Sequence, residues 1–170
     1  MKRQSERVVP AWQAYRKRRA VIPADGYYEW QPVDDGTGKI RKQPYYIHRP
    51  DGHGLSSAGL YELWPYPAKA ADDPDRWLWT AVIITTDATG QAGEIHDRTP
   101  VLLPPDRVDA CLDPTLTDPD KIGAVLRDLT APALELRPVS TQVNRVANND
   151  PHLIDPDSTK AIEPLHLSLA

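Results

Sequence analysis

The sequence predicts an α+β fold built mainly from antiparallel β strands. Short runs of β-forming residues alternate with turn-forming sequences through the first two thirds of the chain. Two short segments in the last third have the apolar periodicity of amphipathic helices. The 18 prolines are twice as many as the nine glycines, and they interrupt the chain too often for long helices.

The chain has 170 residues, 40% of them hydrophobic, which predicts one globular domain over residues 1–170. No segment approaches the roughly 20 consecutive apolar residues that span a bilayer, so we expect no membrane partner. Cys111 is the single cysteine, which excludes an intrachain disulfide framework and a multi-cysteine zinc site. These features favour a reducing, cytoplasmic location.

In chain order, the first elements are a basic helix or extended arm and a series of short strands. Residues 1–19 contain four consecutive basic residues, and a short apolar strand over 20–22 ends at Pro23. Strands are expected over residues 27–31, 44–48 and 57–64, with hairpin-type turns at 34–38 and 51–52.

The second half of the chain begins with its most apolar stretch, residues 77–86. A run that is apolar at nearly every position predicts a strand covered on both faces. Residues 88–100 form an expected loop that ends in a polar cluster. Amphipathic helices are predicted over 105–112 and 119–129, and late strands over 134–139 and 165–167.

Charge is distributed unevenly along the chain. Residues 1–50 contain 11 Lys or Arg against five Asp or Glu, whereas the whole chain has a formal net charge of −4. A basic first third on an acidic body is compatible with a face for anionic ligands, and equally with an ordinary solvated surface.

Glu29 stands in an aromatic strand segment, where alternation places it on the same face as Tyr27 and opposite Tyr28 and Trp30. Partial desolvation among aromatic rings would raise the pKa of its carboxyl group toward the range useful for proton transfer. The alternative is a glutamate on the wet side of a half-exposed strand.

His96 is followed by Asp97 and Arg98, directly before the apolar residues 101–103. The imidazole titrates near neutrality, and the guanidinium can hold a phosphate or carboxylate. Glu29 and His96 together would form an acid/base pair able to open a sugar ring or cleave a carbonyl adduct. A surface loop histidine is the alternative.

Other candidate groups carry less chemistry. His48, Asp51 and His53 straddle a turn without a fourth ligand, so we expect neither a metal site nor a cofactor. Cys111 lies on the apolar face of a short predicted helix, which favours a buried small hydrophobe over a nucleophile.

Five stretches in order, with a closing motif, resemble the SRAP family, the SOS response-associated peptidases that process abasic sites. These stretches are residues 19–30, 42–47, 58–62, 83–88 and 95–103, and the closing motif covers 138–144 with 148–150. The resemblance extends from about Arg16 to Leu153. It implies a barrel-like β sheet with short flanking helices, and binding of single-stranded DNA containing abasic sites.

The resemblance also implies roles for individual residues. Glu29 matches the catalytic glutamate of the family, and His96 matches its catalytic histidine. Arg19 and Arg98 match positions that hold DNA phosphates, and Trp30 matches a position on the DNA-facing surface. Family members form a covalent crosslink with the abasic-site aldehyde during the DNA damage response.

The beginning of the chain departs from the family pattern. SRAP proteins begin Met-Cys-Gly-Arg, and the exposed cysteine captures the aldehyde, whereas this sequence begins with Met1 and Lys2. The domain is therefore expected to be incomplete at its N-terminus, and stable crosslinking by this chain is not expected. An upstream partner fragment or a homo-oligomer would cover the apolar edges left open.

Two other functions compete with abasic-site processing. One is a non-catalytic DNA-binding or scaffold remnant of the SRAP fold, for which DNA binding would be salt-sensitive but indifferent to the lesion. The other is a hydrolase unrelated to DNA that uses Glu29 and His96. For the DNA-binding or scaffold remnant, a residual reactivity is also expected, in which the Met1 or Lys2 amine forms a reversible Schiff base with the aldehyde.

Overall fold

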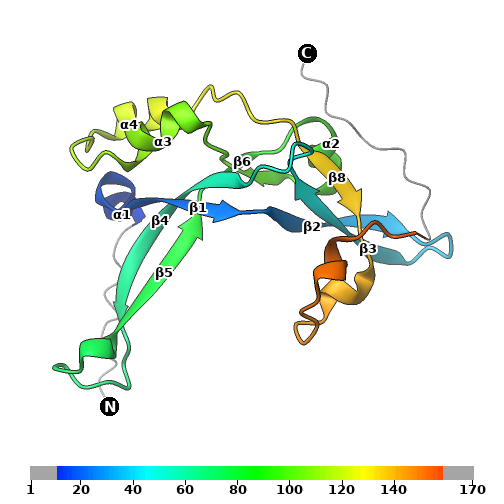
Figure 1. Ribbon diagram of the computed structural model, residues 1–170, viewed down its shortest axis with the longest axis horizontal. Helices are drawn as coiled ribbons and strands as arrows, with labels where there is room; N and C mark the ends of the chain where they lie inside the picture. The colour runs from blue at the N-terminus through cyan, green and yellow to red at the C-terminus, as the bar shows by residue number, and fades with distance from the viewer. Residues whose placement is uncertain (1–10, 159–170) are drawn as a thin grey trace.

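A computed structural model describes residues 11–158 as three small antiparallel sheets with short helices around them (Figure 1). The first sheet has the order β1-β4-β5, formed by Arg19–Ala24, Leu55–Pro65 and Trp77–Ile83. The second has the order β2-β3-β8, formed by Gly26–Asp34, Ile40–His48 and Glu135–Pro138. Strands β6 (Thr85–Asp87) and β7 (Arg98–Pro100) form the third.

Four α-helices and three 3-10 turns complete the described part of the chain. The helices are α1 (Ala11–Lys17), α2 (Gly90–Ile95), α3 (Pro105–Leu112) and α4 (Pro119–Leu126). The 3-10 turns are η1 (Pro74–Arg76), η2 (Thr141–Asn144) and η3 (Pro151–Ile154). No helix within residues 11–158 is long and apolar enough to cross a membrane.

The predicted α+β class with mostly antiparallel strands is confirmed, although the sheets do not close into a barrel. The predicted helix over 105–112 forms with those bounds, and the β2–β3 hairpin turns at Gly36 and Gly38, whose φ angles are positive. Glycine suits these two positions because it has no Cβ to clash in that region. Helix α2 was not predicted, because its two glycines favour a loop. The strand expected over 165–167 lies outside the described residues.

The core consists of two apolar clusters. The first lies on one face of the β2-β3-β8 sheet, and its buried members are Ile47, Leu55, Ile95, Leu102, Leu134 and Leu136. The second packs helices α3 and α4 against β1 and β4, with Ala58, Val101, Leu103 and Cys111 at its centre. Cys111 is 1% exposed and behaves as the small hydrophobe that was expected.

The interpretation of residues 77–86 as a strand covered on both faces is wrong for the described chain. Strand β5 forms there, but every one of its residues is exposed, and β5 is the edge of its sheet. Its apolar side chains have no layer packed over them among residues 11–158, since helix α1 contacts β4 instead.

Gly59 permits the close approach of three strands in the β1-β4-β5 sheet. A Cβ at this position would lie 2.6 Å from Cδ1 of Ile22 and 2.9 Å from the carbonyl oxygen of Val82. Because the second contact is with backbone, Gly59→Ala is expected to lower the free energy of unfolding by about 1–3 kcal/mol. Urea denaturation measures this loss; Gly54→Ala, whose Cβ would meet only one atom at 3.3 Å, should lose less.

Candidate active site

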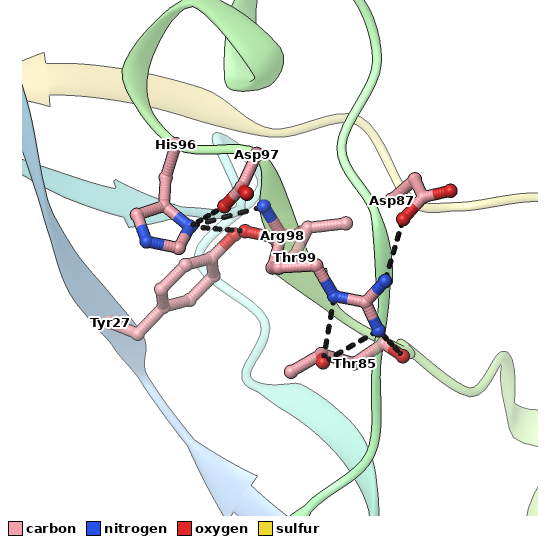
Figure 2. A network of polar contacts seen from close by, with 7 residues as sticks. All are labelled: Tyr27, Thr85, Asp87, His96, Asp97, Arg98 and Thr99. Carbon is pink, nitrogen blue, oxygen red and sulfur yellow. Dashed lines mark hydrogen bonds and ion pairs between the residues drawn. The ribbon is translucent and has the colours of Figure 1, made fainter.

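His96 and Asp97 connect α2 to β7, which begins at Arg98, and this segment lies close to strand β2 (Figure 2). Within this segment the imidazole Nδ1 of His96 accepts a hydrogen bond from the backbone amide of Arg98 at 3.1 Å. The same nitrogen lies 3.2 Å from Oδ1 of Asp97 and 3.3 Å from the carbonyl oxygen of Arg98.

Nδ1 of His96 therefore has a partner in either protonation state. In the neutral ring it accepts from the Arg98 amide, which leaves the proton on Nε2. In the imidazolium form it can donate to the Asp97 carboxylate or to the Arg98 carbonyl. Nε2 forms no hydrogen bond with any residue in the described range, and the ring is exposed. When Nδ1 keeps its proton and donates to the Asp97 carboxylate or the Arg98 carbonyl, the ring exchanges its other proton at Nε2.

Strand β2 directs Glu29 toward the same segment. Tyr27 and Gln31, two residues before and after Glu29, share its face of the strand. The Tyr27 hydroxyl is bonded to Oγ1 of Thr99 at 3.1 Å, and Nε2 of Gln31 donates to the carbonyl oxygen of Glu94 at 3.2 Å.

These two contacts bracket His96, because Glu94 and Thr99 lie on either side of it in the chain. The structure thus brings the face of β2 that carries Glu29 next to the segment that carries His96. The spacing of these residues in the sequence did not show whether they would meet. Glu29 is partly buried, and its carboxylate makes no hydrogen bond within residues 11–158. Its carboxylate remains free to accept a proton from a bound molecule.

Tyr27 connects the strand that carries Glu29 to the segment that carries His96, and the sequence alone did not assign it a role. Burial raises the pKa of its phenol, an effect that the Glu29 carboxylate reinforces and the Thr99 hydrogen bond opposes. The alternation of side chains along a strand already indicates that Tyr27 and Glu29 share one face of β2.

The raised pKa of Tyr27 predicts a loss of stability at alkaline pH. The unfolded phenol titrates near 10.0 and the folded one above it, so this contribution is complete below pH 10 and lost as the pH rises through the folded pKa. Chemical denaturation on both sides of pH 10 should show the decline. Tyr27→Phe should make the decline shallower but not remove it, since the pKa values of Tyr15, Tyr28, Tyr45 and Tyr46 are also raised. An equal decline in that variant would assign the whole effect to other groups.

Arg98 is held in place by residues of the neighbouring strand β6. Its Nη1 donates to Oδ1 of Asp87 at 2.6 Å, and its Nη2 donates to the carbonyl oxygen of Thr85 at 2.7 Å. The Arg98 side chain is still 45% exposed, so the cation remains accessible to an anion from solvent. The ion pair itself contributes little to stability because both side chains are hydrated.

Arg19 occupies a position unlike the one expected. It is 7% exposed, and its guanidinium donates to four backbone carbonyl oxygens, those of Tyr15, Arg16, Cys111 and Asp113. Its hydrogen-bonding capacity is used in joining α1 to the end of α3. The expectation that Arg19 lies on a phosphate-binding surface is therefore wrong. The buried guanidinium instead stabilises the packing of α1 against the end of α3.

Trp30 projects from the face of β2 opposite Glu29. Its indole Nε1 donates to Oδ1 of Asn144 at 2.7 Å, and its ring approaches Tyr28 with 6.5 Å between centroids. Trp30 thus connects the aromatic face of the sheet to η2, which belongs to the closing motif of residues 138–144. Glu29 and Trp30 are adjacent in sequence, but they do not share one surface of the sheet.

The chain is similar to known proteins over most of its length. The family model described as SOS response associated peptidase (SRAP) matches residues 4–146. The abasic site processing protein YoqW of Bacillus subtilis is 38% identical over 138 residues, covering 81% of this chain and 57% of YoqW. The abasic site processing protein HMCES of Gallus gallus is 31% identical, covering 82% of this chain and 44% of HMCES.

Solved structures show the same fold. A crystal structure of a protein from Bacteroides thetaiotaomicron has a TM-score of 0.66 at 26% identity, with 85% of this chain and 59% of that one covered. A phage-related protein from Bordetella bronchiseptica has a TM-score of 0.56 at 34% identity, with 77% and 57% covered. The chain spans about half the length of these relatives. Because the family model matches more than half of the chain, this chain belongs to the SRAP family.

Proposed function

We propose that this chain takes part in processing abasic sites in DNA. It would bind single-stranded DNA at the lesion, and Glu29 and His96 would exchange protons with the abasic sugar. The observation that carries this proposal is the alignment of the Glu29 face of β2 with the segment containing His96, through the contacts of Tyr27 and Gln31. The relatives named abasic site processing proteins support the choice of substrate.

An abasic deoxyribose exists mainly as a closed ring and reacts as the open aldehyde. Opening requires a base that removes the proton of the C1′ hydroxyl and an acid that protonates the ring oxygen as its bond to C1′ breaks. The unbonded carboxylate of Glu29 is suited to the first task. The imidazolium of His96, anchored through Nδ1, is suited to donate the proton from Nε2.

The exposed aldehyde can then react with an amine. Attack by the Lys2 side-chain amine, followed by loss of water, would give a Schiff base that borohydride reduces to a stable adduct. Lys2 lies outside the described range, so this step rests on the sequence. In an SRAP protein with the family's N-terminal cysteine, the thiol and amine would capture the aldehyde together.

Binding and trapping with defined DNA test the proposal. The purified chain is titrated against a single strand with one abasic site, the same strand undamaged, and the matching duplex, with anisotropy as the signal. We expect tighter binding to the abasic strand and a borohydride-trapped adduct on it. Equal, salt-sensitive binding to both single strands, with no adduct, would instead indicate a DNA-binding remnant without chemistry.

Arg98 is expected to contribute one phosphate contact. The affinity for a single strand depends on salt, with a slope of roughly −0.7 for each phosphate neutralised. Arg98→Met should therefore make the slope shallower by about 0.7 and weaken binding at low salt. Arg107→Met is the matched control, since Arg107 also has a carboxylate neighbour and is 40% exposed, but lies on α3. If both variants show the same dependence of affinity on salt, Arg98 does not contact a DNA phosphate.

A further inference from the structure

Helix α2 ends at Ile95, and the carbonyl groups of its last turn need donors from outside the helix. The backbone amide of His96 donates to the carbonyl oxygen of Ala92 at 3.0 Å. In a further helical turn, the carbonyl oxygen of Glu94 would accept from the amide of Arg98. That amide instead donates to Nδ1 of the His96 ring at 3.1 Å (Figure 2). The carbonyl group of Glu94 therefore needs another donor.

Gln31 of strand β2 supplies that donor. Its side-chain Nε2 donates to the carbonyl oxygen of Glu94 at 3.2 Å. A helix-terminal carbonyl without a partner would compete with the His96 ring for the Arg98 amide, because a backbone carbonyl is a strong acceptor. The bond from Gln31 satisfies the end of α2, and it leaves the Arg98 amide free to bond the ring.

Tyr45 of strand β3 fixes the direction of the Gln31 amide. The Tyr45 hydroxyl donates to Oε1 of Gln31 at 3.1 Å, which turns Nε2 of the same amide toward Glu94. Tyr45 lies opposite Glu29 in the register of the two strands and packs against the first core cluster. Burial raises the pKa of its phenol, and the Glu94 carboxylate reinforces this effect. The hydroxyl therefore keeps the proton that it donates at neutral pH.

We propose that Gln31 and Tyr45 are positioning residues, which orient His96 for proton exchange with the abasic sugar. The contacts extend from the core through the Tyr45 hydroxyl and the Gln31 amide to the end of α2, and they keep the Arg98 amide on Nδ1 of His96. Both residues act through the orientation of the His96 ring. The inference rests on the proposed function, because that orientation matters only if His96 takes part in the reaction.

Nuclear magnetic resonance of the free chain tests the positioning in the absence of DNA. A hydrogen bond from the Arg98 amide to Nδ1 of His96 gives a scalar coupling between the two nitrogen nuclei. We expect this coupling at pH of about 8.5, where histidine rings are neutral. Gln31→Met should abolish it, since methionine fills a similar volume but cannot donate to Glu94. Gln13→Met, at an exposed position of α1, is the matched control and should keep the coupling.

Single-turnover trapping on abasic single-stranded DNA measures the consequence for the reaction. Misplacing a group by about 1 Å can slow a reaction by about 10²-fold. Gln31→Met should therefore react about 10- to 100-fold more slowly than the wild type, with unchanged affinity for the strand. Gln13→Met should react at the wild-type rate. Urea denaturation confirms that each variant is folded before rates are compared.

Tyr45→Phe is the milder second variant. It keeps the aromatic ring against the core cluster and removes only the hydroxyl that orients the Gln31 amide. The coupling between Arg98 and His96 should weaken, and trapping should slow by about 2- to 10-fold, the loss expected from one hydrogen bond.

Three results would overturn the proposal. The first is a wild-type chain without the coupling, and the second is a coupling that persists in both Gln31→Met and Tyr45→Phe. The third is trapping at the wild-type rate by a Gln31→Met chain that has lost the coupling. Failure of the proposed function gives a different result: the coupling depends on Gln31 as expected, but the wild-type chain forms no adduct. Gln31 would then still orient His96, and the assigned reaction would be wrong.

Discussion

Glu29→Gln is expected to slow formation of the borohydride-trapped adduct on abasic single-stranded DNA by about 10²- to 10⁴-fold. Glutamine keeps the shape of the side chain and its place between Tyr27 and Gln31, but it cannot accept the proton of the sugar hydroxyl. Binding to the abasic strand should change little, since the loss is in proton transfer. Single-turnover trapping on a gel, at saturating protein, measures the rate of the chemical step.

His96→Ala should produce a loss of similar size, because ring opening needs the acid as well as the base. The two losses should not add in the double variant if the residues act on one step. The controls are Glu135→Gln, a partly buried glutamate on β8, and His152→Ala, a histidine whose Nδ1 lies 2.8 Å from Asp155. Trapping rates for Glu29→Gln that match the wild type would refute the assigned chemistry.

Arg19→Met is expected to cause the largest loss of stability among single substitutions in α1 and β1. The guanidinium of Arg19 is buried and donates to four carbonyl oxygens at 2.6 to 3.0 Å. Methionine preserves most of the side-chain volume but leaves those acceptors without their partner. Hydrogen bonds to charged groups contribute about 1.5–3 kcal/mol each, though not additively, so a total loss of about 3–5 kcal/mol is expected.

Thermal denaturation measures this effect as a shift of the midpoint, roughly 2–4 °C for each kcal/mol in a domain of this size. Arg18→Met is the control, because Arg18 pairs with Glu62 near the surface, where both side chains are about one quarter exposed. It should cost at most about 1 kcal/mol. If Arg19→Met instead weakened DNA binding while leaving the midpoint unchanged, the structural assignment of Arg19 would be wrong.

Local sequence was enough to predict most strands of the fold. Alternation along β2 placed Tyr27 with Glu29 and Tyr28 with Trp30, and the ring contact between Tyr28 and Trp30 agrees with it. The turn after β2 was predicted from its turn-forming residues, and its two glycines adopt positive φ angles that other residues avoid. These features depend on neighbours in the chain, so a single sequence contains the information.

Burial was less predictable, because it depends on what packs against an element. The apolar pattern of β5 predicts cover on both faces, but none of the described residues provides it. Arg19 and Arg98 look alike as basic residues beside apolar strands. Only the fold shows that the first is enclosed by backbone carbonyls and that the second is exposed beside Asp87.

The sequence by itself determined the family resemblance, the order of the strands along the chain, and the two residues, Glu29 and His96, to which the proposed chemistry is assigned. Tertiary structure decided that their segments meet, because the bonds from Tyr27 to Thr99 and from Gln31 to Glu94 span 72 and 63 positions of the chain. Such contacts form only when β2 and the α2–β7 segment are packed together, and no local pattern encodes that distance.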